Sequence, residues 1–598
     1  MLIKISMNHI SIRDIIDSKF PTLFSGDPAF IKNIIFSFLH RLLFIPRINS
    51  FLERNGDKTG IEFIEELFDE LDISYKLSNK DREKIPSEGK IIIVANHPLG
   101  GLDGLILLKL VSEIRRDVKI LANDLLMNIQ NLSDSFIPFD LYSKKDLKKN
   151  YIQISDALKK EFALIIFPAG EVARFTIKGI KDRKWNKGAV YFAEKLQSPV
   201  LPVYIRGRNS LLFYFISLIK KNFSMFLLPY ELFNKKGKTF EIKIGHPISP
   251  KAFNTKYQKI EFLTKSLKKH LYLIGKNKKG LFETEKSVIH PVSTKLLRHQ
   301  LFNNQFIGKT IDGKKIFIVE YQKSKEIMNE IARLREITFR KVGEGTGTKK
   351  DSDKFDKFYK HIVLWDDNQL EIVGSYRLAD CKSIFDQFGF EGLYTSTLFR
   401  LNDNFIPILF NAVELGRSFV QSKYWNSLAL DYLWQGIGKF LTLNKDKRYL
   451  FGPVSLSNNY SLEAKELIVY FFSKWFPPKN NFVTSLNPFQ ISENSLKNLK
   501  QIFNLNDYSR ELIVLKNQLN NYGYTIPVLY KQYADLCLPG GVQFLGFNID
   551  PNFGNCIDAF ILVDLKYLKY NKRKRYLSEE SHFEVDDNMV LIENNSIS

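Results

Sequence analysis

The segment KIIIVANHPLGGLDGLILLKLVSEI, residues 90–114, decides the fold class of the N-terminal half of the chain. It opens with the short apolar run KIIIVAN, which predicts a buried β-strand. A turn containing two glycines comes next, and LDGLILLKLVSEI then has the length and apolar content of a helix. A buried strand that leads directly into a helix is the repeating unit of α/β domains with a parallel sheet.

The same alternation continues on the C-terminal side of this segment. Further strands are expected at DVKILAN, FALIIFP, SPVLPVYIRG and TFEIKIGHPI, and helices at ISDALKKE, AVYFAEKLQ and YQKIEFLTKSLKKHLYLI. The pattern predicts one α/β domain over residues 76–275 with a largely parallel sheet. We expect residues 1–75 to form an N-terminal helical segment that could associate with a membrane.

A second α/β unit is expected over residues 312–566, after a linker at residues 276–311 that contains KNKKG. Its strands are expected at KKIFIVEY, KHIVLWD, LEIVGSYRLAD, NAVELGRSFV, VQFLGFNID and IDAFILVDL, and its helices at SKEIMNEIARLREITF and SLALDYLWQGIGKFLTLN. Asp366-Asp367-Asn368 predicts a hairpin turn between the second and third of these strands. The charged tail, residues 567–598, is expected to be disordered. The fold class is therefore α/β with two domains, the second of mixed α/β type.

The charge balance is strongly basic, with 87 Lys and Arg against 65 Asp and Glu in 598 residues, a formal net charge of +22. Such a surplus favours acidic partners: nucleic acid, anionic lipid or an acidic carrier protein. Lys-rich codon usage explains it equally well. No nucleic-acid recognition motif is present and the basic residues are dispersed, so no nucleic-acid partner is expected. Three isolated cysteines indicate neither a disulfide framework nor a Cys-based zinc site, and no metal or other cofactor is expected.

Two apolar segments, residues 30–51 and 211–228, are too interrupted by charged residues to predict a spanning helix. Each could lie flat in a lipid interface, or pack as an amphipathic helix on the core. Together with the absence of a signal-peptide pattern, this favours a cytoplasmic protein that is peripheral on the cytoplasmic face of the inner membrane.

Asn96-His97 lies directly after the first buried strand, at the sheet edge where ligands of parallel α/β domains bind. The Gly100-Gly101 turn could bring Asp103 back to the imidazole of His97. A carboxylate on one ring nitrogen fixes the tautomer and leaves the other nitrogen free to take a proton from an alcohol. Taken alone, a His at a strand end before an N-capping Asp has a structural explanation at least as good.

A second stretch, FPAGEVAR, places Glu171 and Arg174 in a turn after another strand, and such an Arg suits a phosphate or carboxylate. NHPLGGLDG, FPAGEVAR and VLPVYIRG, in this order over residues 80–250, resemble the glycerolipid acyltransferases of the lysophosphatidic-acid acyltransferase type. The resemblance implies that His97 deprotonates an acceptor hydroxyl, that Asp103 orients it, and that Asn96, Gly100, Gly101, Glu171 and Arg174 bind substrate. The donor would be an acyl thioester of acyl carrier protein or coenzyme A.

The match departs from that family in two places. Five residues separate His97 from Asp103 where the family has four, and Glu171 stands one place late, after Gly170. Both departures keep the chemical groups but change their spacing.

The C-terminal half, over residues 315–566, resembles the GNAT-like amino-acid N-acyltransferases of ornithine-lipid synthesis, through LREITFRKV, DKFDKFYKHIVLWD, IVGSYRL, ELGRSFV and LDYLWQGIGKFL. The resemblance suggests Glu414 as the base for the amine and Arg417 as a carboxylate or phosphate contact. It suggests donor binding at Gln435, Gly436 and Gly438, although Leu433 breaks the usual spacing. A structural ion pair is an equal explanation for Glu414 and Arg417. Asp353, Asp356 and His361 also match, without a derivable role.

Joined in this order, the halves resemble bifunctional ornithine-lipid synthases. The expected activity is N-acylation of an amino acid by a 3-hydroxyacyl group, then O-acylation of that hydroxyl. Ornithine is the first expected acceptor and glycine the second, and acyl carrier protein and a membrane lipid surface are the expected partners. One alternative is a lysophospholipid O-acyltransferase with a diverged C-terminal domain. Another is a non-catalytic basic protein that binds membranes or nucleic acid.

Overall fold

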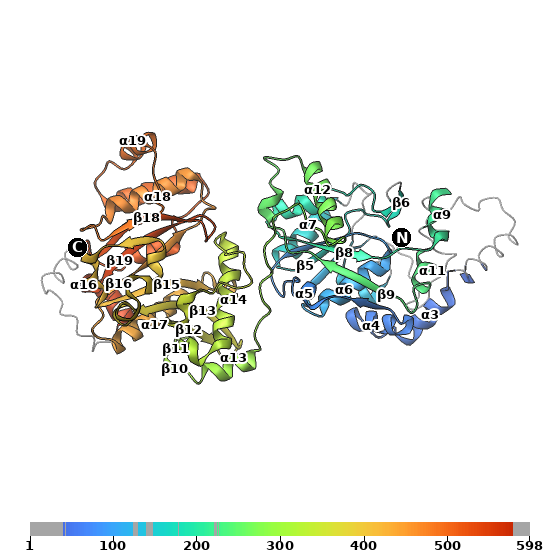
Figure 1. Ribbon diagram of the computed structural model, residues 1–598, viewed down its shortest axis with the longest axis horizontal. Helices are drawn as coiled ribbons and strands as arrows, with labels where there is room; N and C mark the ends of the chain where they lie inside the picture. The colour runs from blue at the N-terminus through green and yellow to red at the C-terminus, as the bar shows by residue number, and fades with distance from the viewer. Residues whose placement is uncertain are drawn as a thin grey trace. The chain divides into compact units, whose positions relative to one another are not determined.

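The computed structural model describes residues 37, 40–41, 43–122, 129–138, 147–176, 179–219, 224 and 227–577. The chain divides into two compact units, the N-terminal unit (residues 1–290) and the C-terminal unit (residues 291–598). Both combine a sheet with helices, as predicted (Figure 1).

The N-terminal unit contains a seven-stranded sheet in the order β1-β9-β8-β2-β5-β3-β4. All neighbouring strands are parallel except β8 and β9, so the prediction of a largely parallel sheet is confirmed. The strands are β1 (Ser74–Lys76), β2 (Ile91–Ala95), β3 (Val118–Ala122), β4 (Phe136–Pro138), β5 (Ala163–Ile166), β8 (Val200–Arg206) and β9 (Thr239–Ile244).

Helices cover both faces of this sheet. Ile91, Ile93 and Ala95 of β2 pack with α4 (Gly60–Leu71) and α6 (Gly101–Ser112). Ile92 and Val94 pack on the other face with α7 (Leu147–Lys159), α8 (Gly188–Lys195) and α12 (Ile260–Ile274). Because successive strand residues face opposite sides, a strand buried on both faces is apolar throughout, as KIIIVAN is. The strand therefore delivers residues 96 and 97 to the carboxyl edge at the centre of the sheet.

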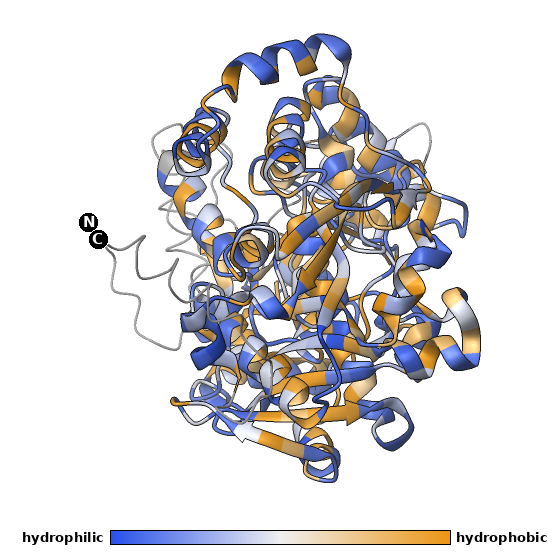
Figure 2. Cartoon of the chain, turned by 90° about the vertical axis from the view of Figure 1, so that its left-hand side faces the viewer, coloured by the Kyte–Doolittle hydropathy of each residue, from blue (hydrophilic) through white to orange (hydrophobic). Residues whose placement is uncertain are grey.

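The C-terminal unit contains an eight-stranded sheet in the order β10-β11-β12-β13-β15-β16-β19-β18. Its strands are β10 (Gln305–Lys309), β11 (Lys315–Glu320), β12 (Lys360–Asp366), β13 (Glu371–Asp380), β15 (Ala412–Val420), β16 (Tyr449–Leu456), β18 (Val542–Asp550) and β19 (Cys556–Asp564). Strands β12 and β13 form the predicted hairpin. Hydrophobic residues are concentrated in the strands, while the surrounding helices carry hydrophilic residues on their outer sides (Figure 2).

The two central strands, β15 and β16, are parallel and pair only over a short stretch. Ala412–Glu414 pairs with Tyr449–Phe451 and the ladder then stops. Beyond it, β15 stays paired with β13 and β16 with β19. Pro453 on β16 has no N–H with which to continue the ladder. The sheet is therefore open between these strands beyond Glu414 and Phe451.

Helices also flank this sheet. On one face lie α17 (Ala429–Leu443), α18 (Leu462–Trp475), α20 (Tyr508–Asn521) and α21 (Val528–Ala534), which share one core with the strands. Part of the other face packs against α14 (Lys325–Val342), through Ile327 and Ile331. The rest of that face carries the short 3-10 turns around residues 389–405.

Two segments expected to lack regular structure are ordered. The linker stretch contains α13 (Thr294–Leu301), whose Leu297 and Leu301 are buried, and strand β10. The predicted disorder from residue 567 is wrong for α22 (Tyr570–Tyr576). Its Tyr576 ring lies 5.9 Å from that of Trp434. Each segment is held by only a few apolar residues among many charged ones, so its sequence did not predict regular structure.

The expected membrane-associating segments fall partly outside the described residues. Of the N-terminal segment, α3 (Ile45–Arg54) and the residues after it are described. Of residues 211–228, α9 (Leu211–Ile219) and the start of α11 (Leu228–Phe233) are described. Within the described ranges, no helix is both long and apolar enough to span a bilayer.

Candidate active sites

Asn96 fixes the backbone at the carboxyl end of β2. Its side-chain amide donates to the carbonyl of Ile205 at 2.8 Å and its carbonyl accepts from the N–H of the same residue at 2.8 Å. This pair of bonds ties β2 to β8 just where their ladder ends. Asn96, expected to bind substrate, is thus occupied in positioning the residue after it.

His97 and Asp103 are in contact, as the sequence predicted. Nδ1 of His97 lies 3.0 Å from Oδ2 of Asp103. The carboxylate is fully buried, whereas the His97 side chain is 18% exposed. Burial raises the pKa of Asp103, and the hydrogen bonds from His97 and from the backbone oppose that rise. Nε2 of His97 makes no hydrogen bond with any described residue and is the nitrogen left for a substrate proton.

The turn between the two residues accommodates the additional residue of the spacing. Gly100 has φ of +90° and caps α6, and Gly101 is the first residue of that helix. A Cβ on Gly100 would also lie 2.8 Å from the side chain of Leu228. Both glycines shape the turn, and Gly100 is required by conformation and by space.

Asp182 supports His97 from another loop, and the sequence analysis missed it. The N–H of His97 donates to Oδ1 of Asp182 at 3.1 Å, and Nε1 of Trp185 donates to Oδ2 at 2.8 Å. The side chain is buried, and burial raises its pKa. No spacing relates position 182 to position 97, so only the tertiary structure reveals the contact. Phe167 completes the support, with its ring stacked on the imidazole at 4.3 Å.

The FPAGEVAR segment lies beside His97, because the N–H of Ala173 donates to the carbonyl of His97 at 2.7 Å. Arg174 begins strand β6 (Arg174–Thr176) and is buried. Its guanidinium donates to Ser224, lies 5.3 Å from the ring centre of Phe213, and its Nε is 3.9 Å from Oε2 of Glu171. Burial lowers the pKa of Arg174. The structure therefore brings together all the residues expected in the first site.

Glu414 has a different environment from the one expected of a base that faces solvent. It is buried, and Oε1 accepts from the N–H and hydroxyl of Thr395. Oε2 accepts from the hydroxyl of Tyr359 and the N–H of Tyr394. Burial raises the pKa of Glu414, which these hydrogen bonds partly offset. Four donors occupy the carboxylate, so the geometry favours a role in ordering residues 394–395 over direct contact with an amine.

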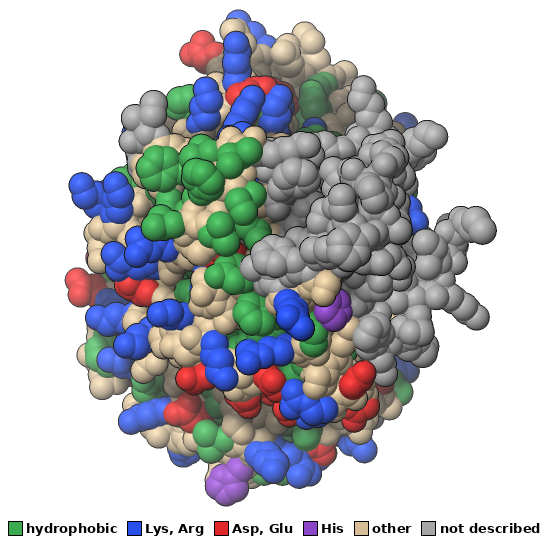
Figure 3. All heavy atoms as spheres, turned by 90° about the vertical axis from the view of Figure 1, so that its right-hand side faces the viewer, with side chains coloured by type: hydrophobic (Ala, Val, Ile, Leu, Met, Phe, Trp, Pro, Cys, Tyr) green, Lys and Arg blue, Asp and Glu red, His purple; other side chains and the backbone are tan. Residues whose placement is uncertain are grey.

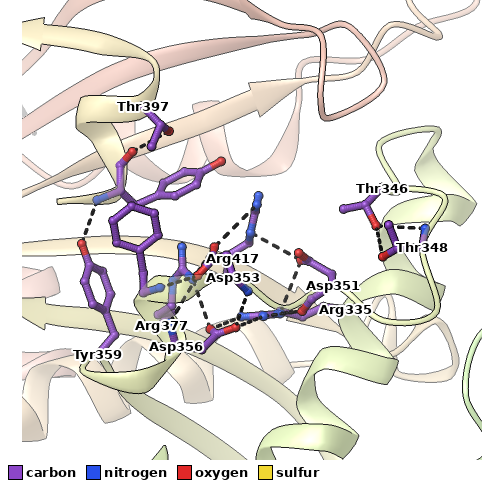
Figure 4. A network of polar contacts seen from close by, with 12 residues as sticks. Arg335, Thr346, Thr348, Asp351, Asp353, Asp356, Tyr359, Arg377, Thr397 and Arg417 are labelled. Atoms are coloured by element: carbon purple, nitrogen blue, oxygen red, sulfur yellow. Dashed lines mark hydrogen bonds and ion pairs between the residues drawn. The ribbon is translucent and has the colours of Figure 1, made fainter. Parts of the chain in front are cut away.

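Arg417 lies beyond the point where β15 and β16 separate, in the left-handed region with φ of 48°. Its guanidinium lies between two rings, 4.7 Å from the centre of Tyr394 and 4.6 Å from that of Phe553. Nε is 3.4 Å from Oδ2 of Asp351 and Nη2 is 3.9 Å from Oδ2 of Asp353, so Arg417 forms ion pairs with the buried network, while Nε makes no hydrogen bond with a described residue (Figure 4). The prediction that Arg417 contacts a substrate carboxylate or phosphate stays open, with Nε as the donor left for it.

Asp353 and Asp356 belong to a buried ion network that also includes two arginines the sequence analysis did not select (Figure 4). Arg335 donates to both oxygens of Asp356 at 2.9 and 2.7 Å. Arg377 donates to Asp353 at 2.7 and 2.8 Å and to Asp356 at 3.1 Å. His361 is also buried, with Nε2 3.3 Å from Asp356. Paired buried charges of this kind fix the loop before β12 to the sheet.

Gln435, Gly436 and Gly438 lie inside α17, in contrast to the donor-binding turn expected there. A Cβ on Gly436 would lie 2.7 Å from Ile362, and one on Gly438 would lie 1.8 Å from the carbonyl oxygen of Tyr576. Gln435 donates to Asp431 at 3.0 Å. Amides inside a helix are already hydrogen-bonded and cannot bind a phosphate. The glycines instead permit close packing of α17 on β12 and on α22.

Comparison with known proteins agrees with this two-part organisation. Residues 15–278 match the family described as acyltransferase, and residues 334–435 match the acetyltransferase (GNAT) domain.

Two relatives from Bacteroides thetaiotaomicron are similar to the chain. A glycine N(alpha)-acyltransferase is 33% identical over 310 residues, 49% of this chain and 91% of the relative. A lyso-glycine lipid O-acyltransferase is 33% identical over 254 residues, 41% of this chain and 90% of the relative. The 1-acyl-sn-glycerophosphate acyltransferase of Thermotoga maritima covers 40% of this chain and 88% of its own at 19% identity, with a TM-score of 0.23, too low to support a conclusion. The chain therefore belongs to the acyltransferases, in the families of the glycine N(alpha)-acyltransferases and the lyso-glycine lipid O-acyltransferases.

Proposed function

We propose that this chain makes a two-chain aminolipid by two successive acyl transfers. The observation that carries the proposal is the presence, in one chain, of similarity to an amino-acid N-acyltransferase and to an O-acyltransferase that uses the resulting lyso-lipid. The GNAT match at residues 334–435 supports N-acylation by the C-terminal unit, and the acyltransferase match supports O-acylation by the N-terminal unit.

In the first transfer, the amine of the amino acid attacks the thioester carbon of a 3-hydroxyacyl donor. An amide bond forms, the carbon–sulfur bond breaks, and the thiol leaves with the proton that the amine loses. Arg417, whose Nε makes no hydrogen bond with a described residue although Asp351 and Asp353 lie within ion-pair distance, would bind the carboxylate of the amino acid. The opening between β15 and β16 is where we place the thioester.

In the second transfer, Nε2 of His97 takes the proton of the 3-hydroxyl as its oxygen attacks a second thioester. Asp103 holds Nδ1 and stabilises the imidazolium that forms. The new ester bond replaces the carbon–sulfur bond, and the imidazolium returns the proton to the leaving thiolate. Arg174, with Glu171 beside it, would position the carboxylate of the N-acyl amino acid near His97.

Glycine is the acceptor we propose, although ornithine was the first expectation from the sequence. Both similar Bacteroides relatives carry names that refer to glycine or to a lyso-glycine lipid. Ornithine is the alternative outcome of the lipid experiment. The net charge of +22 suits an acidic donor, and acyl carrier protein is the donor we propose, with coenzyme A, which also carries anionic phosphates, as the alternative.

A membrane surface is the proposed site of action, on the cytoplasmic face of the inner membrane. Helix α9 exposes one apolar stripe formed by Leu211, Phe215, Leu218 and Ile219, which are 86, 63, 70 and 71% exposed. Its other side is anchored beside the first site, because Phe213 packs on Arg174. Figure 3, viewed from the side where α9 lies in Figure 1, shows hydrophobic side chains gathered on the surface with Lys and Arg around them. Such a stripe, together with a basic surface, suits anionic lipid.

The test is expression of the full chain in a host that makes no aminolipid, and mass spectrometry of the lipid extracts. The proposal expects a two-chain glycine lipid, and a His97→Ala chain that accumulates the single-chain N-acyl glycine. An ornithine lipid would retain the mechanism and change the acceptor. Increased phosphatidic acid alone would favour the lysophospholipid O-acyltransferase with a diverged C-terminal domain. Unchanged lipids would favour a non-catalytic binding protein.

A further inference from the structure

A group of polar side chains lines the opening between β15 and β16, on the same face of the sheet as Glu414. Ser455 lies on β16 beyond the last residue paired with β15, and its hydroxyl donates to Oε2 of Glu344 at 2.9 Å. Ser455 is directly opposite Asp558 on β19. Side chains directly opposite in an antiparallel pair project from the same face, about 5 Å apart. Glu344, Ser455 and Asp558 are therefore neighbours although they are far apart in the sequence.

The pair of carboxylates is buried without a cation of its own. Glu344 and Asp558 are 6% and 5% exposed. The described residues show no ion pair for either, and apart from Ser455 the contact given is a thiol: Cys556 Sγ lies 3.7 Å from Asp558. Leaving two carboxylates in such a place costs free energy unless a positive charge joins them.

Arg417 provides the opposite charge across the opening. It is close enough for its charge to oppose the burial-driven rise in the pKa of both Glu344 and Asp558. Its guanidinium lies between the rings of Tyr394 and Phe553 and within ion-pair distance of Asp351 and Asp353, and its Nε makes no hydrogen bond with a described residue. The hydroxyl of Tyr530, which is fully buried and also has no hydrogen-bond partner among the described residues, is close enough to Asp558 and Glu344 to interact with their charges. Nε of Arg417 and this hydroxyl are thus two donors near the acidic pair that make no hydrogen bond with a described residue.

We infer that Glu344 and Asp558 bind the ammonium group of the amino-acid substrate and remove its proton, while Arg417 binds its carboxylate. The ammonium of a zwitterionic amino acid supplies the cation for which Glu344 and Asp558 show no ion pair among the described residues, and its carboxylate can accept from Nε of Arg417. The inference rests on the proposed N-acylation by the C-terminal unit, and it assigns the base that Glu414 is too enclosed to be.

The proton balance of the step is simple. One carboxylate takes a proton from the ammonium, and the free amine then attacks the thioester carbon. The second proton, which the nitrogen loses as the amide forms, goes to the leaving thiolate, and the carboxylic acid releases the first proton to solvent. A base works best with a pKa near the working pH. Burial raises the pKa of Glu344 to about 7 and that of Asp558 to about 8.

The experiment measures both transfers on the purified full chain. Glu344→Gln and Asp558→Asn are compared with the wild type for acylation of glycine by a 3-hydroxyacyl thioester, from pH 6 to pH 10. Synthetic N-(3-hydroxyacyl)glycine provides the O-acylation rate of the same preparations. In Glu344→Gln, the side-chain carbonyl can still accept the hydrogen bond from Ser455. Should either substitution unfold the chain, the same rates are measured on Ser455→Ala, a milder change in the same group of residues.

At neutral pH, kcat/KM for glycine should fall roughly 100-fold in both variants, with O-acylation unchanged. Activity should recover at alkaline pH, where free glycine loses its proton without a base, and a purely structural defect would not recover. If the variants acylate glycine as fast as the wild type at neutral pH, the assignment of Glu344 and Asp558 as the base is wrong, while the proposed N-acylation stands. A wild-type chain that acylates neither glycine nor ornithine would overturn the proposed N-acylation and this inference with it.

Discussion

Three donors converge on one oxygen between His97 and Asp103. Oδ2 of Asp103 accepts from the N–H groups of Leu99 and Gly100 at 2.8 and 3.1 Å, and Nδ1 of His97 is 3.0 Å away. The backbone of the turn thus fixes the carboxylate in the direction of the imidazole. The additional residue in the spacing therefore does not weaken the pair, because the turn at Gly100 absorbs it.

Asp103→Asn should reduce O-acylation roughly 10²–10⁴-fold, because an amide cannot stabilise the imidazolium and can hold the wrong tautomer. The rate is measured with synthetic N-(3-hydroxyacyl)glycine as acceptor, and N-acylation by the same preparation should stay at the wild-type rate. Asp156→Asn, an exposed site on α7, is the matched control. Equal O-acylation rates in Asp103→Asn and the control would remove Asp103 from the mechanism.

The sequence predicted the first site because its residues lie on two contiguous motifs. Asn96 to Asp103 and Glu171 to Arg174 each come directly after a buried strand, and parallel strands bring their carboxyl ends to one edge. Asp182 has no such relation to the motif, and its contact with His97 requires the tertiary fold. The sequence motifs therefore predict contacts between residues that follow adjacent strands, and they do not predict a contact from a distant loop.

The second site was predicted less well for a specific reason. Strand β16 was not among the predicted strands. It contains Gly452-Pro453, a pair typical of turns, and Pro453 lies just beyond Phe451, the last residue paired with β15. The strand that carries Ser455 was therefore missing, and with it the link to Glu344. Glu414 was predicted as the base for the amine, a contact that its burial and its four hydrogen bonds disfavour.

Glu414→Gln should destabilise the C-terminal unit by about 1–3 kcal/mol, because the new amide group would face donors where the carboxylate accepted four hydrogen bonds. Urea unfolding measures the loss. The loss in N-acylation should not recover at alkaline pH, in contrast to the Glu344 variant. If the Glu414→Gln chain has wild-type stability, and its N-acylation is lost at neutral pH but recovers at alkaline pH, Glu414 is the base instead.

Gly438→Ala should lower the free energy of unfolding by about 1–3 kcal/mol, because the added methyl would overlap the carbonyl of Tyr576 and push α22 from α17. The KM for the acyl donor should stay at the wild-type value, since the position is a packing contact. Gly308→Ala on β10, where an added Cβ would meet no atom within 4 Å, is the control for the loss of glycine. If Gly438→Ala raises the KM for the acyl donor and leaves the stability unchanged, residues 435–438 bind the donor, as first predicted.

Phe215→Ser with Leu218→Ser should weaken binding to anionic vesicles at least tenfold, because burying each side chain is worth about 1.5–3 kcal/mol. Vesicle sedimentation measures this, and O-acylation of a micellar acceptor should change little. Phe262→Ser on α12, an isolated site that is 59% exposed, controls for the loss of an exposed ring. If the double variant and the control bind equally, α9 is not the membrane contact.

The stability of the C-terminal unit should fall as pH rises from about 4.5 to about 7, and Glu344 gives the reason. Its pKa is raised from 4.5 to about 7 by burial, and its charged or titratable neighbours are Asp558, Cys556, Arg417, Tyr460 and Tyr530. Between these values the unfolded chain has lost a proton that the folded chain keeps, so the folded state binds more protons and loses stability as pH rises. The full effect is about 3 kcal/mol.

Urea unfolding monitored by tryptophan fluorescence at pH 5 and pH 7.5 measures this loss of stability, and Glu344→Gln should flatten its dependence on pH. Parallel slopes in the two proteins would show that Glu344 is already ionised in the folded chain, and that its carboxylate has a cationic partner before the amino acid binds.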